Sequence, residues 1–170
     1  MRHYGRGELA LGASPVSESL ADLFERAGIP TQVSDNVAGM LWAKLVINCA
    51  WNAMSAITRQ PYGVLMAVEG TRALVTMIVD ECRAVARVCA VTLPDDITAS
   101  TLAIAETMAG QHSSTAQDLA RGRPGEIEHL NGFIVRQAQA HGIATPINHA
   151  LLVQIRALEQ RHATSDMSSC

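Results

Sequence analysis

The chain has 170 residues, of which 48% are hydrophobic and 17% charged, and its formal net charge is −3 at pH 7. This composition can bury one core and excludes an intrinsically disordered chain. No apolar run is long enough to cross a bilayer, and the first residues lack the apolar stretch of a secretory signal. Scattered basic residues argue against a nucleic-acid partner, and four dispersed cysteines argue against a disulfide framework. We therefore expect a soluble, cytoplasmic protein without a membrane partner.

The first 34 residues predict a short β-α-β unit. Residues 8–12 and 31–34 have the character of strands. Between them, a helix is expected to begin near Pro15 and to end at Gly28 and Pro30. Such a unit is too small to bury its own faces. We interpret residues 1–34 as the remnant of an α/β domain whose other strands are absent from the sequence.

From Asp35 onward the pattern is helical, and aromatic residues make up only 4% of the chain. Aliphatic residues in this proportion favour packed helices over a β-sandwich. Proline, glycine and a polar linker at 110–122 separate five predicted helices, over residues 36–59, 68–90, 95–109, 124–140 and 146–161. The chain is therefore expected to be mainly α, with a helical domain over residues 35–162 and a disordered tail over 163–170.

A polar stripe runs along the helix predicted over residues 36–59. At 100° per residue its members are Lys44, Asn48, Trp51, Asn52 and Ser55. The rest of this helix is apolar, which is typical of a buried helix. Because buried ammonium and amide groups need partners, the stripe should face a cleft or a set of partners. From spacing alone, a solvated stripe on a half-exposed helix is an equally good interpretation.

A second polar cluster contains Ser113, Ser114 and Glu126. Pro124 at a helix start would place Glu126 in the first turn, where the helix dipole favours a carboxylate. Helix-end electrostatics alone would explain this glutamate, and ordinary loop or cap chemistry would explain the serines.

The remaining candidates are weaker. The six histidines show no metal-ligand spacing with the cysteines, so no metal site is predicted. Cys82 and Cys89 lie seven residues apart on one helix face and are interpreted as core residues. Gly5 and Gly7 do not form a dinucleotide-binding fingerprint, because the third glycine and its helix are missing.

Three segments, in order and at the right intervals, resemble the ketopantoate reductase (2-dehydropantoate 2-reductase) family. They are Leu41 to Asn48 with Asn52, Arg123 to Gly132, and His141 to Asn148. The resemblance implies an N-terminal Rossmann domain that binds NADPH, followed by an all-helical domain similar to the C-terminal domain of 6-phosphogluconate dehydrogenase. The resemblance further implies that the substrate is held between the two domains. The expected function is reduction of ketopantoate by hydride transfer in pantothenate biosynthesis, with NADPH bound mainly by a domain absent from this chain.

The resemblance also implies roles for five residues. Lys44 resembles the catalytic lysine, which stabilises and protonates the 2-keto oxygen. Asn48 and Asn52 resemble the amides that orient the substrate, and Ser114 resembles the serine that binds its carboxylate. Glu126 resembles a catalytic glutamate that reaches across the cleft toward cofactor and substrate.

Some residues depart from the family pattern. Ala53 stands where proline is usual, Gly125 where threonine is frequent, and Glu128 where aspartate is frequent. These departures loosen the assignment of ketopantoate, so a reductase of another 2-oxo acid remains an alternative. A third alternative is a non-catalytic helical domain for dimerisation or partner binding. A homo-oligomer is expected in either case, and the chain alone is expected to bind no NADPH and to turn over no substrate.

Overall fold

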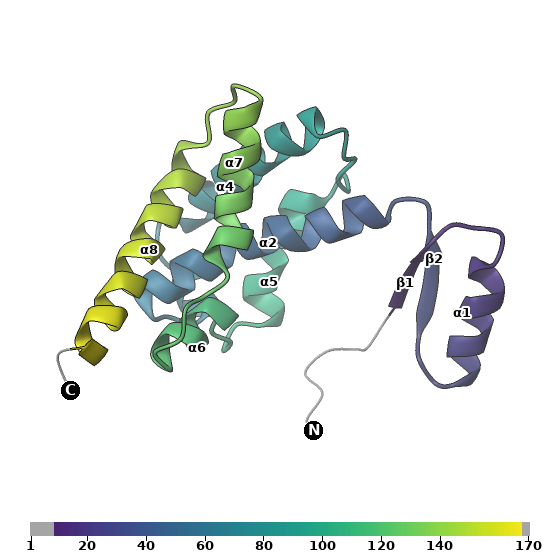
Figure 1. Ribbon diagram of the computed structural model, residues 1–170, viewed down its shortest axis with the longest axis horizontal. Coiled ribbons are helices and arrows are strands. Elements are labelled where there is room, and N and C mark those ends of the chain that lie inside the picture. The colour runs from purple at the N-terminus through teal and green to yellow at the C-terminus, as the bar shows by residue number, and fades with distance from the viewer. Residues whose placement is uncertain (1–8, 168–170) are drawn as a thin grey trace.

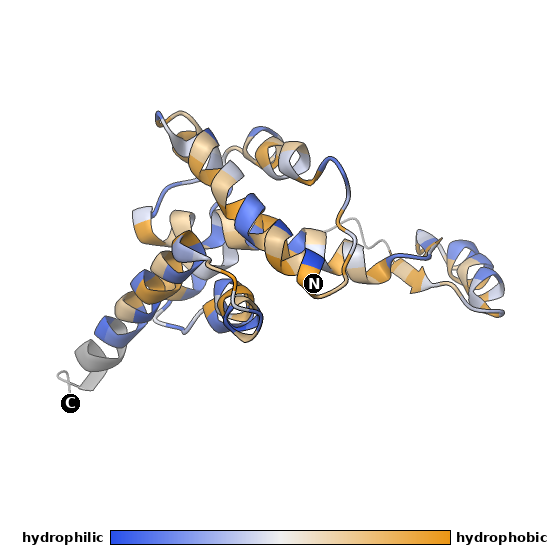
Figure 2. Ribbon diagram, turned by 90° about the horizontal axis from the view of Figure 1, so that it is seen from above, coloured by the Kyte–Doolittle hydropathy of each residue, from blue (hydrophilic) through white to orange (hydrophobic). Residues whose placement is uncertain are grey.

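The computed structural model describes residues 9–167, with side chains as far as Arg161. It is mainly helical, as the sequence predicts. At its N-terminal end, strands β1 (Leu9–Gly12) and β2 (Thr31–Ser34) pair in parallel, with Leu9 opposite Thr31. Helix α1 (Ser17–Arg26) connects them and completes the predicted β-α-β unit. This unit forms an arm that extends away from the other helices in both Figure 1 and Figure 2.

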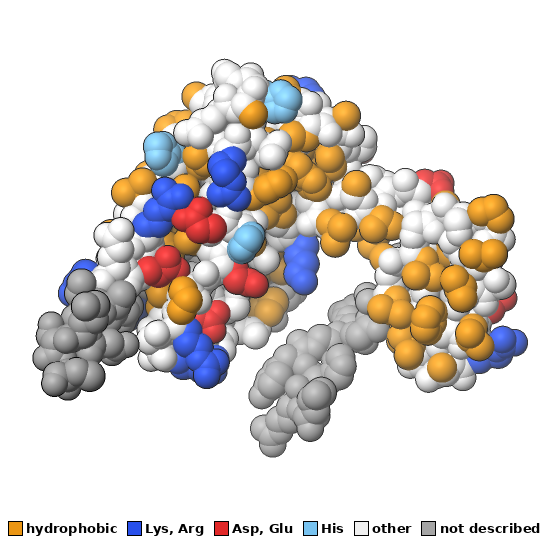
Figure 3. Space-filling model, in the orientation of Figure 1, with side chains coloured by type: hydrophobic (Ala, Val, Ile, Leu, Met, Phe, Trp, Pro, Cys, Tyr) orange, Lys and Arg blue, Asp and Glu red, His pale blue; other side chains and the backbone are white. Residues whose placement is uncertain are grey.

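The arm leaves an apolar surface uncovered. Helix α1 ends before Gly28, whose φ of +77° suits a glycine, and the chain then returns along β2. Leu20 is 41% exposed and Leu23 is 53% exposed, and Figure 3 shows hydrophobic side chains gathered over this part of the molecule. Two strands and one helix cannot cover one another completely.

Helix α2 (Val37–Thr58) follows the arm directly and crosses the middle of the helical bundle (Figure 1). Asn36 caps its first turn by accepting a hydrogen bond from Gly39 N at 2.9 Å, and its amide donates to Thr92 O at 2.8 Å. Arg59 ends the helix in the left-handed conformation, with φ 57°. The predicted helix over 36–59 is therefore confirmed to within one residue at each end.

Seven further elements pack around α2. They are α3 (Tyr62–Met66), α4 (Thr71–Val88), α5 (Ile97–Thr107), α6 (Ser114–Ala120), the 3-10 turn η1 (Ile127–His129), α7 (Asn131–Ala140) and α8 (Pro146–Met167). The core lies between α2 and these helices, with Val46, Ala50, Val79 and Ile155 fully buried. None of the helices that the structure describes is long and apolar enough to cross a membrane.

The structure differs from the sequence prediction in four places. Helix α3 was not predicted, and the linker at 110–122 contains helix α6. The helix predicted over 124–140 is the turn η1 followed by α7, because Leu130 between them has φ −104° and ψ −104°. Helix α8 runs past the predicted end at Arg161, so the predicted tail is helical as far as Met167.

Candidate functional site

The polar stripe on α2 changes its surroundings along the helix. Lys44 is exposed, Asn48 is half-buried, and Asn52 is buried with 4% of its surface exposed. Ser55 is completely buried. Each of the two interpretations of the stripe therefore holds for a part of it: the Lys44 end is solvated, whereas the other end is enclosed and partnered.

Trp51 does not belong to the polar stripe. Its side chain is fully buried, its Nε1 donates a hydrogen bond to Thr101 O at 2.8 Å, and its ring centroid lies 5.5 Å from that of Tyr62. Placing Trp51 with the polar side chains was wrong, because the core supplies the one acceptor that the indole needs. The ring instead anchors α2 against α3 and α5.

The start of α6 lies against the enclosed end of the stripe. Ser113 caps α6 by accepting a hydrogen bond from Ala116 N at 3.0 Å, and its hydroxyl donates to Asn52 O at 3.0 Å. Its N–H donates to Ser55 Oγ at 3.2 Å. The Asn52 amide in turn lies 3.4 Å from Ser114 Oγ. The structure therefore brings Asn52 and Ser114 together, and Ser114 keeps an exposed hydroxyl.

Lys44 is the only lysine in the 170-residue sequence, beside twelve arginines. Its side chain makes no hydrogen bond or ion pair with the described residues. An ammonium can give up its proton far more readily than a guanidinium, and here it is free to contact a ligand. A single lysine among thirteen basic residues points to Lys44 as a candidate site residue, and this observation does not depend on helix periodicity.

Glu126 is exposed, and its side chain forms no hydrogen bond or ion pair with the part of the chain described. The prediction placed Glu126 in the first turn of an α-helix. In the structure it lies immediately before η1. Gly125 beside it packs so closely on α6 that an added Cβ would lie 2.9 Å from Thr115 Cγ2. Thr115 therefore fills the space that a side chain at position 125 would need.

Helix α8 holds the backbone and the neighbours of Glu126 in place. Gly125 N donates to Glu159 Oε1 at 2.8 Å, and Arg156 contacts both carboxylate oxygens of Glu128, at 2.5 and 2.9 Å. The hydrogen bond from Arg156, with the charges of Arg156 and Arg136, lowers the pKa of Glu128 below its usual range. Glu126 thus projects from an anchored segment while its own carboxylate stays free.

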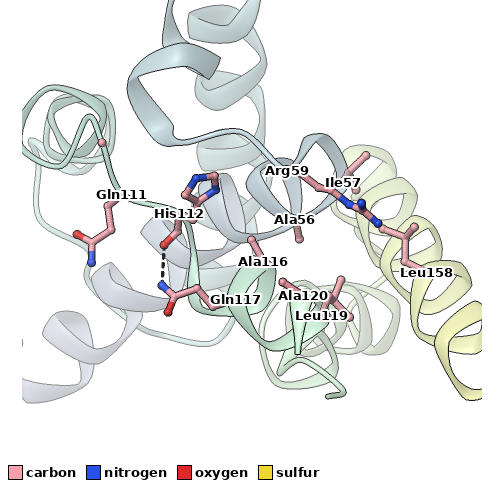
Figure 4. A pocket seen from close by; sticks show the side chains of 11 residues that line it. Ala56, Ile57, Arg59, Gln111, His112, Ala116, Gln117, Leu119, Ala120 and Leu158 are labelled. Carbon is pink, nitrogen blue, oxygen red and sulfur yellow. Dashed lines mark hydrogen bonds between the residues drawn. The ribbon is translucent and has the colours of Figure 1, made fainter. Parts of the chain in front are cut away.

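A pocket of about 610 Å³ lies at the junction of α2, α6 and α8 (Figure 4). Its walls are mainly apolar, from Ala56, Ile57, Leu119 and Leu158, with Arg59 at its edge. None of the five predicted site residues lines this pocket. Sequence reasoning missed it because alanine and leucine at such positions are typical of a core.

The cysteines behave as core residues where they are enclosed. Cys49 and Cys82 are fully buried, and burial raises the pKa of the Cys49 thiol. Cys89 is half-buried. Among residues 9–161, no group of three histidine, cysteine, aspartate or glutamate side chains could hold a metal ion. Gly5 and Gly7 lie outside the described residues.

Comparison with known proteins relates this fold to nicotinamide-dependent enzymes. A PanE/ApbA family ketopantoate reductase from Ralstonia eutropha JMP134 is 51% identical, with a TM-score of 0.90 over 95% of this chain and 54% of that protein. A D-mandelate dehydrogenase in complex with NADH and anilino(oxo)acetate is 26% identical, with a TM-score of 0.85 over 95% of this chain and 70% of that protein. The chain thus falls in the class of helical domains that accompany dehydrogenases and reductases.

The family pattern described as "Ketopantoate reductase PanE/ApbA C terminal" matches residues 36–159. This chain therefore belongs to the ketopantoate reductase family and corresponds to its helical C-terminal part. The 2-dehydropantoate 2-reductases of Vibrio cholerae and Pyrobaculum aerophilum are 38% and 36% identical over 89% and 91% of this chain. The match spans about half the length of these relatives, 50% and 55% respectively.

Proposed function

We propose that this chain is the helical, substrate-binding part of a cytoplasmic 2-dehydropantoate 2-reductase that uses NADPH to reduce ketopantoate to pantoate. The observation that carries the proposal is the α2 stripe, which runs from a free ammonium at Lys44 to a buried amide at Asn52 beside the Ser114 hydroxyl. Membership of the family and the names of its relatives support the choice of substrate.

Reduction of a 2-oxo acid to a 2-hydroxy acid requires a hydride at the keto carbon and a proton at the keto oxygen. A nicotinamide cofactor supplies the hydride when bound. The oxygen gains negative charge as the hydride arrives, and the Lys44 ammonium stabilises this charge and then donates the proton. Lysine suits the role because it can both bind an oxyanion and release a proton, whereas arginine stays protonated.

The other polar groups of the site hold the substrate. Asn48 and Asn52 can donate and accept hydrogen bonds through their amides, which suits a molecule that carries keto and hydroxyl oxygens. Ser114 offers a hydroxyl donor to the substrate carboxylate at the end of the stripe opposite Lys44. The hydrogen bond from Ser113 to Asn52 O fastens the start of α6 to α2 and so helps to hold Ser114 beside Asn52.

Glu126 is the residue of this chain that we assign to the cofactor side of the cleft. Its carboxylate is exposed and unpartnered within the described residues, so it can accept hydrogen bonds from donors on the cofactor or the substrate. A related dehydrogenase binds NADH. The choice of NADPH rather than NADH rests on the family resemblance.

The test uses a two-domain protein in which the nucleotide-binding part of the Ralstonia eutropha relative precedes this chain. We expect it to oxidise NADPH in the presence of ketopantoate, as measured by absorbance. Lys44→Ala and Lys44→Arg should each lower kcat by about 10²- to 10⁴-fold, because neither side chain donates the proton. Arg72→Lys on the exposed side of α4 serves as the control. A Lys44→Ala protein with kcat within a few-fold of the parent would rule out the assigned role.

A second candidate substrate is a bulkier 2-oxo acid. The D-mandelate dehydrogenase with TM-score 0.85 forms a ternary complex with NADH and anilino(oxo)acetate, an aromatic 2-oxo compound. The same two-domain protein, assayed with a panel of branched and aromatic 2-oxo acids, separates the candidates. A higher kcat/KM for an aromatic acid than for ketopantoate would favour the second.

A further inference from the structure

Helix α2 receives a hydrogen bond from outside at the turn that carries the substrate-binding amides. Asn131, the first residue of α7, donates from its amide Nδ2 to Cys49 O at 3.1 Å. In an α-helix this carbonyl already accepts from the N–H four residues later. Cys49 follows Asn48 and precedes Asn52 by three residues. The contact therefore lies at the middle of the proposed substrate-binding turn.

Asn131 belongs to a buried polar chain that joins four helices. Its Nδ2 also donates to Asn148 Oδ1 at 2.9 Å, and Asn148 Nδ2 donates to Glu81 Oε2 at 2.7 Å. Glu81, on α4, further accepts from the N–H groups of Ile147 and Asn148 at 2.8 and 2.9 Å. The chain thus runs from α4 through the start of α8 and the start of α7 to α2.

The chemistry of Glu81 sets the direction of every amide in this chain. A carboxylate accepts hydrogen bonds, so Asn148 must turn its Nδ2 toward Glu81 and its Oδ1 toward Asn131. Asn131 must then offer its own Nδ2 to Asn148. Asn131 and Asn148 are both completely buried, and the Asn131 Oδ1 has no hydrogen-bond partner among the described residues. In this arrangement the Asn131 Nδ2 donates to α2, while the Asn131 Oδ1 is unpaired among the described residues.

An unpaired buried acceptor destabilises a core, so packing alone would favour an apolar side chain at position 131. Apolar contacts cover most of α2 and do not by themselves specify one register along the helix. A directional hydrogen bond to one carbonyl does. Asn131 also follows Glu126 by only five residues, across the short turn η1. The bond therefore ties the segment that carries Glu126 to the helix that carries Lys44.

We propose that Asn131, oriented by Asn148 and Glu81, is a positioning residue that holds α2 and the Glu126 segment in the register needed for reduction. It touches neither substrate nor cofactor and acts through the backbone of α2. This inference rests on the proposed function. A displacement of about 1 Å in a catalytic group can lower turnover by roughly 100-fold.

The test compares Asn131→Leu with Thr101→Val in the two-domain protein described above. Both changes remove a fully buried polar group, but among the described residues the Thr101 hydroxyl bonds only to Ile97 O, within its own helix α5, at 2.7 Å. We expect Asn131→Leu to lower kcat by roughly 10- to 100-fold with little change in the KM for NADPH. Thr101→Val should lower the melting temperature and leave kcat within twofold. Kinetics are measured well below both melting temperatures.

Hydrogen exchange supplies a readout that does not need activity. Asn131→Leu should speed exchange of the α2 amides at residues 50–53, and Thr101→Val should not. If the parent protein reduces no 2-oxo acid, the proposed function fails while the exchange result still reports on the anchor. If the parent is active and Asn131→Leu keeps kcat within twofold, the positioning role is refuted, whatever the exchange shows. Should Asn131→Leu not fold, Glu81→Gln at the half-buried end of the chain must lower kcat in the same way.

Discussion

Glu128 shows how a single side chain holds the loop beside the proposed site. Its carboxylate joins η1 to Arg156 on α8 and to Arg136 on α7, and it is 44% exposed. Exposure to solvent weakens such a network, so we expect Glu128→Gln to reduce the free energy of unfolding at pH 7 by less than about 1 kcal/mol. The substitution should have a larger effect on how the free energy of unfolding depends on pH.

The folded protein depresses the pKa of Glu128, chiefly through the hydrogen bond from Arg156. A depressed pKa contributes stability that is fully present above the unfolded-state value of about 4.3. This stability disappears as the pH falls through the lower folded-state pKa. Urea unfolding at pH 7, 4.5 and 3 should therefore show the difference between parent and Glu128→Gln shrinking toward acid. Glu106→Gln, on an exposed residue of α5, is the control, and an equal trend there would contradict this account.

Elements with a regular local pattern could be predicted from the sequence. Strand β2 and helix α2 repeat side chains with the periods of a strand and a helix, and glycine or proline marks their limits. The five candidate site residues were likewise proposed from spacing and from a family resemblance. Two of them, Asn52 and Ser114, are brought together by the structure.

Elements without such a pattern could not be predicted, because tertiary contacts make them. Helix α6 has seven residues in a polar stretch, and it forms where Ser113 caps it and fastens it to α2. The helix predicted to begin near Pro124 is interrupted at Leu130, so Glu126 lies outside helix α7. The bonds from Asn131 to Cys49 and Asn148 span 82 and 17 residues, and no local pattern reports them.

Substitution of the two serines at the start of α6 should affect different properties: stability for Ser113 and substrate binding for Ser114. Ser113→Ala removes both the cap and the bond to Asn52 O, so it should destabilise the protein by about 1–2 kcal/mol. Ser114→Ala removes an exposed hydroxyl, so it should leave stability within about 0.5 kcal/mol and raise the KM for the 2-oxo acid. Urea unfolding and steady-state kinetics on the two-domain protein measure the pair. Equal losses of stability would contradict the division of roles.

The molecule as a whole presents two surfaces of different kinds. The helical bundle encloses a continuous core, whereas the β-α-β arm exposes Leu20, Leu23 and the unpaired edges of two strands. Unpaired edges and apolar faces favour association. The 170-residue chain by itself should therefore form dimers or larger species at tens of micromolar concentration.

Sedimentation of the parent chain and of Leu23→Glu tests this surface. The substitution places a charge on the arm and should shift the population toward monomer. Val153→Glu, at a position on α8 that is 50% exposed, introduces the same charge on the bundle and should not. A parent chain that stays monomeric at high micromolar concentration would show that the arm does not associate.

The solitary lysine makes the chain selectively addressable by amine chemistry. Reductive methylation with isotope-labelled formaldehyde would mark Lys44 as the one side chain, besides the α-amino group, and a methylated lysine keeps its charge. The chemical shift of that methyl group follows the protonation of one nitrogen as the pH is varied. It also distinguishes an ammonium surrounded by water from one enclosed by a bound acid. A magnetic resonance titration can thus observe the proposed proton donor directly, before any turnover is measured.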